Sequence, residues 1–161
     1  MTAPLPPERA LERLEALCSR SEHCSSELIA KMRTWKLSPD DIEAVIYSLR
    51  RRRFVDDSRF ARAFVRDKYR FNRWGRIKIR MELSAKKISA ELIDEAMEEI
   101  DENIYQERLE SLLASKIKSI HDDDPRIRRQ KILRAAVSRG YEVGLAAQRL
   151  TAIMKGENNQ E

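Results

Sequence analysis

Apolar positions recur with one spacing in three parts of the chain. When Leu37, Ile88 and Tyr141 are set in register, apolar residues occur nine and five positions before each, and five, nine and twelve positions after. The columns are Leu28/Ile79/Ile132, Met32/Leu83/Ala136, Ile42/Ile93/Ala146, Ile46/Met97/Leu150 and Leu49/Ile100/Ile153. These spacings are typical of helices rather than strands, so each copy predicts two helices joined by a short turn.

One segment shows a competing pattern. Residues 77–83 alternate apolar and polar side chains, as a half-buried strand does. The repeat outweighs this pattern, because Ile79 and Leu83 fall in its columns. On a helix, Ile77 and Met81 lie nearly opposite them, and we expect this helix to pack on two sides, against its own repeat and the next.

A longer helix is expected before each pair, over about residues 8–20, 57–71 and 102–120. The chain is therefore predicted to be all-α, with three tandem three-helix repeats that stack on one another. The predicted boundaries are a flexible tail at 1–7, repeats at 8–55, 56–101 and 102–155, and a flexible tail at 156–161.

The turn within each helix pair is predicted to have one geometry. The residue before the register position is Lys36, Lys87 or Gly140. Glycine at this position favours a left-handed helix stop, and we expect the two lysines to adopt the same conformation. Helix starts are expected where a polar residue precedes proline, at Ser38-Pro39 and Asp124-Pro125.

Charge is distributed unevenly along the chain. The formal net charge is +5, but residues 50–87 hold fifteen Lys/Arg and four Asp/Glu, whereas residues 91–124 hold three and twelve. A basic centre beside an acidic segment indicates contact with a polyanion, and contact with a partner or with the chain itself through the acidic part.

The basic residues of the centre form stripes on the predicted helices. At 100° per residue, the arginines of helix 57–71 fall within about 80°, and Phe60, Phe64 and Phe71 lie opposite, where we expect the core. A second stripe follows on the next helix. We call the eight residues together the basic stripe: Arg59, Arg62, Arg66, Arg70, Arg73, Arg76, Arg80 and Lys87.

A charged stripe is often only a solvated face. Here, however, the pairs Arg62/Arg66 and Arg66/Arg70 repel each other by roughly a few tenths of a kcal/mol. Asp67 points away from the stripe, so the sequence offers it no local compensation. This arrangement favours binding to DNA or to an acidic protein surface.

Catalytic and metal-binding patterns are weak. Cys18, His23 and Cys24 lack a fourth ligand and the usual zinc spacing. His121 with residues 122–124 fits an acidic loop that ends in a helix cap, and Asp56-Asp57 fit caps better than a catalytic dyad. The sequence therefore predicts no enzyme, no metal and no cofactor.

Targeting signals are also weak. The N-terminus has no basic and apolar leader, and no run approaches the roughly 18 apolar residues of a membrane span. With only two cysteines, the chain is expected in a reducing cytoplasm, away from membranes.

Several motifs resemble those of the RecX family of recombinase regulators. Residues 54–61, Phe-Val-Asp-Asp-Ser-Arg-Phe-Ala, are similar to the family's aromatic-Ile/Val-Asp-Asp-x-x-Phe-Ala signature. Gly75-Arg76-Ile77, Glu82-Leu83 and Lys86-Lys87-Ile88 continue the similarity, although Lys87 stands where the family often has glycine. The resemblance covers about residues 20–150 and is strongest over 49–100.

The resemblance implies three-helix repeats in an elongated, curved body. It also implies binding to the RecA filament and inhibition of its growth, its strand exchange and its coprotease activity. We therefore expect a RecA-type recombinase filament and single-stranded DNA as partners, and a protein that acts as a monomer.

Two other functions stay open. A tandem helix-turn-helix protein could read duplex DNA, but the second helix of the middle pair, residues 89–101, carries six acidic residues that would repel phosphate. A purely structural adaptor is the third interpretation, should the basic stripe prove inert.

Overall fold

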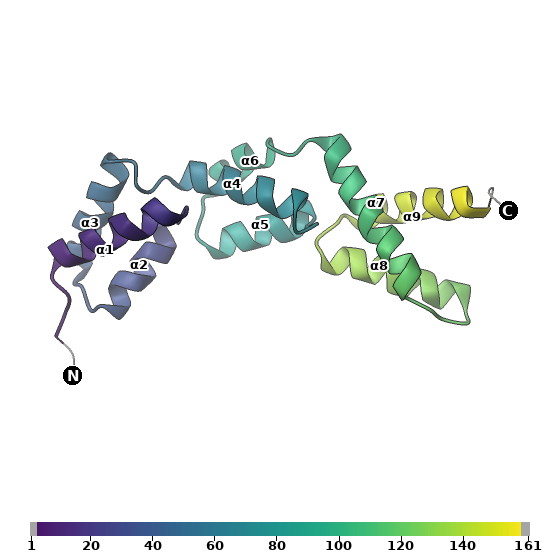
Figure 1. The fold of residues 1–161 in the computed structure, drawn as a ribbon, viewed down its shortest axis with the longest axis horizontal. Helices are drawn as coiled ribbons and strands as arrows, with labels where there is room; N and C mark the ends of the chain where they lie inside the picture. Colours follow the sequence, from purple (N-terminus) through teal and green to yellow (C-terminus); the bar gives the residue numbers. More distant parts are fainter. Residues whose placement is uncertain (1–2, 159–161) are drawn as a thin grey trace. The chain divides into compact units, whose positions relative to one another are not determined.

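The computed structural model describes residues 3–158, which form nine α-helices and no strand (Figure 1). The helices are α1 (Pro7–Arg20), α2 (Ser25–Thr34), α3 (Pro39–Arg51), α4 (Asp57–Arg70), α5 (Arg76–Ala85), α6 (Ala90–Met97), α7 (Glu102–Ser119), α8 (Pro125–Ser138) and α9 (Val143–Asn158). The all-α prediction is confirmed, including helix rather than strand at 77–83. Within the described residues, no helix has the length and apolarity needed to cross a membrane.

Three helices make up each repeat: α1–α3, α4–α6 and α7–α9. The side chains in the register position and in the columns at −9, −5 and +5 are all buried. In the outer columns, Met97, Ile100 and Ile153 are only half-buried. The repeated apolar spacing therefore marks the residues that hold each helix pair together.

The predicted turn is the same in all three repeats. Lys36, Lys87 and Gly140 have positive φ values of 62°, 60° and 94°. In each turn the next N–H donates to the carbonyl five residues back: Leu37 to Met32 at 3.1 Å, Ile88 to Leu83 at 3.2 Å and Tyr141 to Ala136 at 3.2 Å. This is the hydrogen bond of a Schellman helix stop, so the prediction of one shared geometry is confirmed.

The two helix starts that the sequence predicts, at Ser38-Pro39 and Asp124-Pro125, are capped by the side chains of Ser38 and Asp124. The Ser38 hydroxyl accepts from the Asp41 N–H at 3.2 Å. Asp56, not Asp57, caps α4, since its carboxylate accepts from the Arg59 N–H at 3.1 Å. The carboxylate of Asp57 accepts instead from the Ser25 N–H at 2.8 Å and thereby caps α2, in the preceding repeat.

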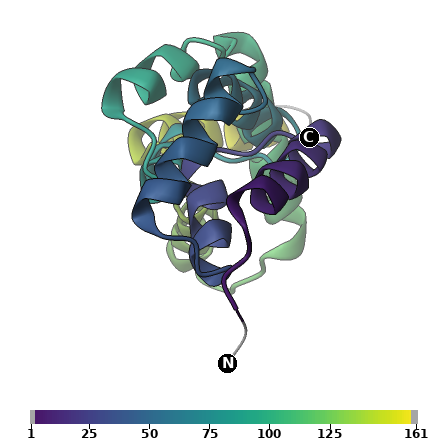
Figure 2. The ribbon, with the colours of Figure 1, turned by 90° about the vertical axis from the view of Figure 1, so that its left-hand side faces the viewer.

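The helices pack into two compact units. The first contains the described residues up to 63 together with 83–95, and the second contains residues 64–82 and those from 96 onward. Both units therefore take part of the middle repeat. In the first, α3 packs against α1 and α2 (Figures 1 and 2). Its fully buried side chains include Leu14, Leu28, Met32 and Leu49.

The predicted tails lie partly outside the described residues, which exclude 1–2 and 159–161. Within the N-terminal stretch, the Leu5 N–H donates to the Trp35 carbonyl at 3.0 Å. At the other end, residues 156–158 continue α9.

The second unit is built around three buried tyrosines, Tyr69, Tyr105 and Tyr141. The rings of Tyr105 and Tyr141 lie 5.2 Å apart, in a tilted arrangement. Burial raises the pKa of Tyr141 to about 12. This core joins α4 and α5 to the third repeat.

Two glycines allow the backbones in the second unit to meet closely. The Gly75 N–H donates to the Arg139 carbonyl at 2.8 Å, and the Ile77 N–H donates to the Gly140 carbonyl at 3.0 Å. A Cβ atom at Gly75 would overlap the backbone of Gly140 and Tyr141. The N-terminus of α5 thus contacts the third repeat through backbone rather than through side chains.

This backbone contact explains one wrong prediction. Ile77 and Met81 do not pack against the next repeat, because their side chains are 48% and 67% exposed.

Phe71 is also wrongly predicted as core: it is 78% exposed, since α4 ends one residue earlier at Arg70 and the chain turns away. Phe60 is buried as predicted, and Phe64 is half-buried edge-on to Trp74, with centroids 6.1 Å apart.

Candidate functional site

Two arginines of the basic stripe on α4 pair with carboxylates from other segments. The Arg59 Nε donates to Glu22 at 2.6 Å, and its Nη2 donates to the Arg53 carbonyl at 3.2 Å. Arg66 Nη1 lies 3.4 Å from a Glu99 carboxylate oxygen. The prediction that the stripe is uncompensated is therefore wrong at Arg59 and Arg66, because the structure brings acids to them that are distant in sequence.

The other two arginines of α4 are more available. Arg62 is exposed and has no hydrogen bond or ion pair with any described residue. Arg70 is also exposed; its Nε donates to the Tyr69 hydroxyl at 3.0 Å, and the guanidinium lies 5.5 Å from the centre of that ring. The Tyr69 hydroxyl raises the pKa of Arg70, so this side chain stays charged. Arg62 and Arg70 present cations that the fold leaves for solvent or a partner.

Arg76 has a structural role in the second unit. Its guanidinium pairs with Glu102 and, at 3.1 Å, with Glu142, and it lies 4.0 Å from the ring centre of Tyr105. The buried Tyr105 hydroxyl donates to Glu142 at 2.5 Å and accepts from the Arg76 N–H at 3.0 Å. Burial, followed by the hydrogen bond to Glu142, raises the pKa of Tyr105. Partial burial is the largest single effect and lowers the pKa of Arg76, but the hydrogen bond to Glu102 and the charge interactions with Tyr105, Glu102 and Glu142 together outweigh it and raise the pKa.

The rest of the basic stripe is divided between partly covered and exposed side chains. Arg73 is half-buried and donates to the Ser111 hydroxyl at 3.4 Å. Arg80 and Lys87 are exposed. Arg80 shares its face of α5 with the exposed Ile77 and Met81. The structure thus gives α5 a mixed basic and apolar surface, where sequence reasoning expected an apolar contact.

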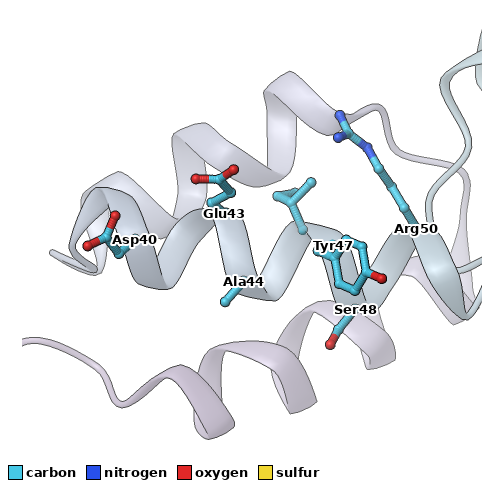
Figure 3. Close-up of a pocket in the computed structure, with 7 residues that line it drawn as sticks. Asp40, Glu43, Ala44, Tyr47, Ser48 and Arg50 are labelled. Atoms are coloured by element: carbon cyan, nitrogen blue, oxygen red, sulfur yellow. The ribbon is translucent and has the colours of Figure 1, made fainter.

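A second surface, on α3, was missed by sequence reasoning. A pocket of about 600 Å³ runs along this helix (Figure 3), with Asp40 and Glu43 towards one end and Arg50 at the other. The side chain of Tyr47 lines it and is 64% exposed. The sequence signal for this surface is the run of four arginines at 50–53, of which Arg50 lines the pocket.

Potential metal ligands are used within the fold. Cys18 and Cys24 are free thiols, and burial raises the pKa of Cys18. The His23 Nδ1 lies 3.1 Å from Glu27. Asp122 accepts from the Asp124 N–H at 2.9 Å and pairs with Lys131 at 3.0 Å, as an acidic loop before a helix would. No group of three or more His, Cys, Asp or Glu residues in the described part of the chain is placed to hold a metal.

The sequence is similar to proteins of one family along most of its length. The family model for "RecX, second three-helix domain" matches residues 56–97. The "Regulatory protein RecX" of Clostridium acetobutylicum is 30% identical over 155 residues, which cover 93% of this chain and 71% of that protein. The "Regulatory protein RecX" of Prosthecochloris aestuarii is 29% identical over 147 residues, covering 91% of this chain and 94% of the relative.

Solved structures share the fold. A crystal structure of regulatory protein RecX superposes with a TM-score of 0.80 at 21% identity, covering 86% of this chain and 70% of that one. RecX from Lactobacillus salivarius superposes with a TM-score of 0.79 at 18% identity, covering 91% and 95%. The three-helix repeats are therefore an arrangement that occurs in crystal structures of similar proteins.

Proposed function

The chain belongs to the RecX family of regulatory proteins, and from this we propose that it regulates homologous recombination by binding a RecA-type recombinase filament. In this role it restrains assembly of the filament and its activities. The observation that carries the proposal is the similarity to the RecX protein of Clostridium acetobutylicum, which covers 93% of the chain. The relatives are named regulatory proteins, in keeping with an action by binding rather than by catalysis.

The basic stripe is the contact surface we propose for the filament. We expect the groove of the recombinase filament to offer both DNA phosphates and acidic protein patches. Arginine pairs bidentately with phosphate and with carboxylate. Arg62 and Arg70 support this role best, because both are exposed and neither forms an ion pair with a described residue. Carboxylates of the protein itself already pair with Arg59, Arg66 and Arg76, and the anions of the filament would have to compete with them. We therefore expect these three arginines to contribute less to binding.

Single-stranded DNA is a further proposed partner, reached through the same basic surface. We propose that the protein acts as a monomer in the cytoplasm. Readout of duplex DNA by a helix-turn-helix is the weaker alternative. In the middle repeat the second helix of the pair is α6, and its exposed Glu91, Asp94 and Glu95 would repel the phosphates of a major groove.

Charge reversal on α4 tests the proposed surface. The variant Arg62→Glu/Arg70→Glu is compared with Arg126→Glu/Arg134→Glu, which makes the same change in net charge on exposed side chains of α8. Arg128 is unsuitable as a control because it donates to the carbonyls of Ile117 and Ile120, at 2.7 and 3.0 Å.

The assays are a pull-down with purified recombinase, with and without single-stranded DNA and nucleotide, and inhibition of the recombinase ATPase. The α4 variant should bind and inhibit more weakly than both the wild type and the α8 variant. Equal inhibition by the α4 variant and the wild type would show that the stripe does not contact the filament. The acidic helix α6 would then be the next candidate surface. Failure of the wild type to bind the filament would refute the function itself.

A further inference from the structure

A small pocket in the first unit gathers positive charge outside the stripe on α4. It has a volume of about 180 Å³, which is room for several water molecules. Cationic side chains reach it from three places: Arg33 on α2, Arg50 on α3, and Lys87 in the turn between α5 and α6. We call it the basic pocket; its lining residues are Ser25, Ser26, Ile29, Arg33, Arg50, Asp57 and Lys87.

The fold offsets only part of this positive charge. The Arg50 Nη2 donates at 3.1 Å to the hydroxyl of Ser25, which is an uncharged partner. Within the described residues, the side chains of Arg33 and Lys87 have neither a hydrogen bond nor an ion pair. The one carboxylate in the lining belongs to Asp57, and its Oδ1 already accepts from the Ser25 N–H at 2.8 Å. Three cations therefore face one carboxylate, and the net positive charge of the lining attracts an anion.

The donors of the basic pocket suit phosphate better than carboxylate. Two guanidinium groups from two helices and an ammonium group from a turn approach it, so that they can bond several oxygens of one tetrahedral anion. The pocket also lies at the first turn of α2, whose dipole adds partial positive charge. A planar carboxylate has only two oxygens and would leave part of this donor set unused.

The surroundings of the basic pocket extend beyond a single anion. Arg50 also lines the pocket along α3 shown in Figure 3, where the Tyr47 ring is 64% exposed. An exposed aromatic ring close to a phosphate site is the combination by which proteins hold single strands, through stacking and backbone charge. The acidic Asp40 and Glu43 limit the basic region at the far end.

We propose that the basic pocket binds a phosphate group, and that this phosphate belongs to the backbone of single-stranded nucleic acid. This inference rests on the single-stranded DNA proposed above as a partner, and it gives that partner a defined site that binds without the recombinase. It adds Arg33 and Arg50 to the basic residues that contact nucleic acid, and it gives Lys87 a specific ligand.

The chain offers matched variants for a test. Lys87→Gly removes a cation at a left-handed position that glycine adopts without strain, and Lys36→Gly makes the same change in the same turn of the first repeat. Arg50→Gln removes the second cation, and Arg51→Gln makes that change one residue further along α3. Neither Lys36 nor Arg51 lines the basic pocket.

Binding of a fluorescein-labelled single-stranded oligonucleotide is measured by anisotropy over a range of salt, with no recombinase present. The Lys87→Gly/Arg50→Gln variant should lose affinity by about tenfold or more, because charged hydrogen bonds to phosphate are lost. Its salt dependence should become shallower by about 0.7 for each phosphate contact removed. The Lys36→Gly/Arg51→Gln variant should stay within about twofold of wild type, and circular dichroism checks that both are folded.

Two further arms identify the source of the anion. Titration with inorganic phosphate should shift the amide NMR signals of Ser25 and Ser26 in the wild type, at higher concentration than the oligonucleotide, and not in the pocket variant. Equal losses in both double variants, or no loss in either, would overturn the proposal. A pocket variant that binds the oligonucleotide normally but no longer binds poly-glutamate would assign the pocket to an acidic protein. Shifts with free phosphate but unchanged oligonucleotide binding would refute the single-strand source.

Because this test contains no recombinase, its result is independent of the filament experiment. If the pocket does not bind the oligonucleotide, the proposal of filament binding still stands. If the wild type does not bind the filament, the proposal of a phosphate site still stands.

Discussion

Replacing Gly75 by alanine should strongly destabilise the second unit. The added Cβ would overlap the carbonyl carbon and oxygen of Gly140 and the nitrogen of Tyr141. All three are backbone atoms, which cannot move aside as the tip of a flexible side chain can. The segment before α5 must therefore separate from the turn between α8 and α9.

The magnitude follows from two effects. Overpacking by one carbon costs about 1–3 kcal/mol where the surroundings are rigid. Separation also weakens the hydrogen bonds from Gly75 N–H to the Arg139 carbonyl and from Ile77 N–H to the Gly140 carbonyl, each contributing about 0.5–1.5 kcal/mol. We expect Gly75→Ala to lower the free energy of unfolding by about 2–6 kcal/mol in total.

Denaturant unfolding of the full chain, followed by circular dichroism, measures this loss, and amide exchange at Ile77 shows whether it arises at the predicted place. Gly144→Ala is the control: apart from its chain neighbours and the backbone of its own helix, no described atom lies within 4 Å of the added Cβ, and the position is in α9. That change should stabilise the protein by up to about 1 kcal/mol through helix propensity. If Gly75→Ala is as stable as wild type and Ile77 stays protected, the close backbone contact is not part of the folded protein.

Three other changes test the repeats and their connection. Leu83→Ala removes a fully buried side chain and should cost about 2–5 kcal/mol in denaturant unfolding; an unchanged midpoint would contradict its core position. Lys36→Gly should stabilise by about 1 kcal/mol, because φ is 62° there, and a loss of stability would argue against the left-handed turn. Partial burial opposes ionisation of Glu27, but the hydrogen bonds from Lys86 and His23 and the charge interactions with both together outweigh it and lower its pKa below 4.5. Ionised Glu27 therefore stabilises the folded protein fully above pH 4.5, and this contribution is lost as the pH falls through the lower pKa of Glu27 in the folded protein. On acidification, Glu27→Gln should lose less free energy of unfolding than the wild type does.

The fold could be predicted because its information is local and repeated. Three copies of one apolar spacing identify the helix pairs even where residues 77–83 alternate like a strand. The glycine in one copy also predicted the turn in the others, and Lys36 and Lys87 adopt positive φ although lysine rarely does. Because three segments share one register, a misleading pattern in one of them does not change the predicted secondary structure.

The pairing of the basic stripe could not be predicted for the opposite reason. Arg59 meets Glu22 across 37 positions of sequence, and Arg76 meets Glu142 across 66. A helical projection shows which charges share a face, but the acids that neutralise them come from other helices. Only the packing of helices within each unit shows which arginines pair with carboxylates of the protein and which remain available to a partner.

The run of four arginines at 50–53 shows how such a separation arises. Arg50 points to the basic pocket through Ser25, whereas Arg52 pairs with Glu15 and lies 5.3 Å from the ring centre of Phe54. Arg53 takes the left-handed position that ends α3, with φ 61°. The helix ends within this run, so Arg50, Arg52 and Arg53 point in different directions and meet different environments. Arg50 directs its charge to Ser25, and this places the proposed anion site at the junction of α2, α3 and the turn before α6.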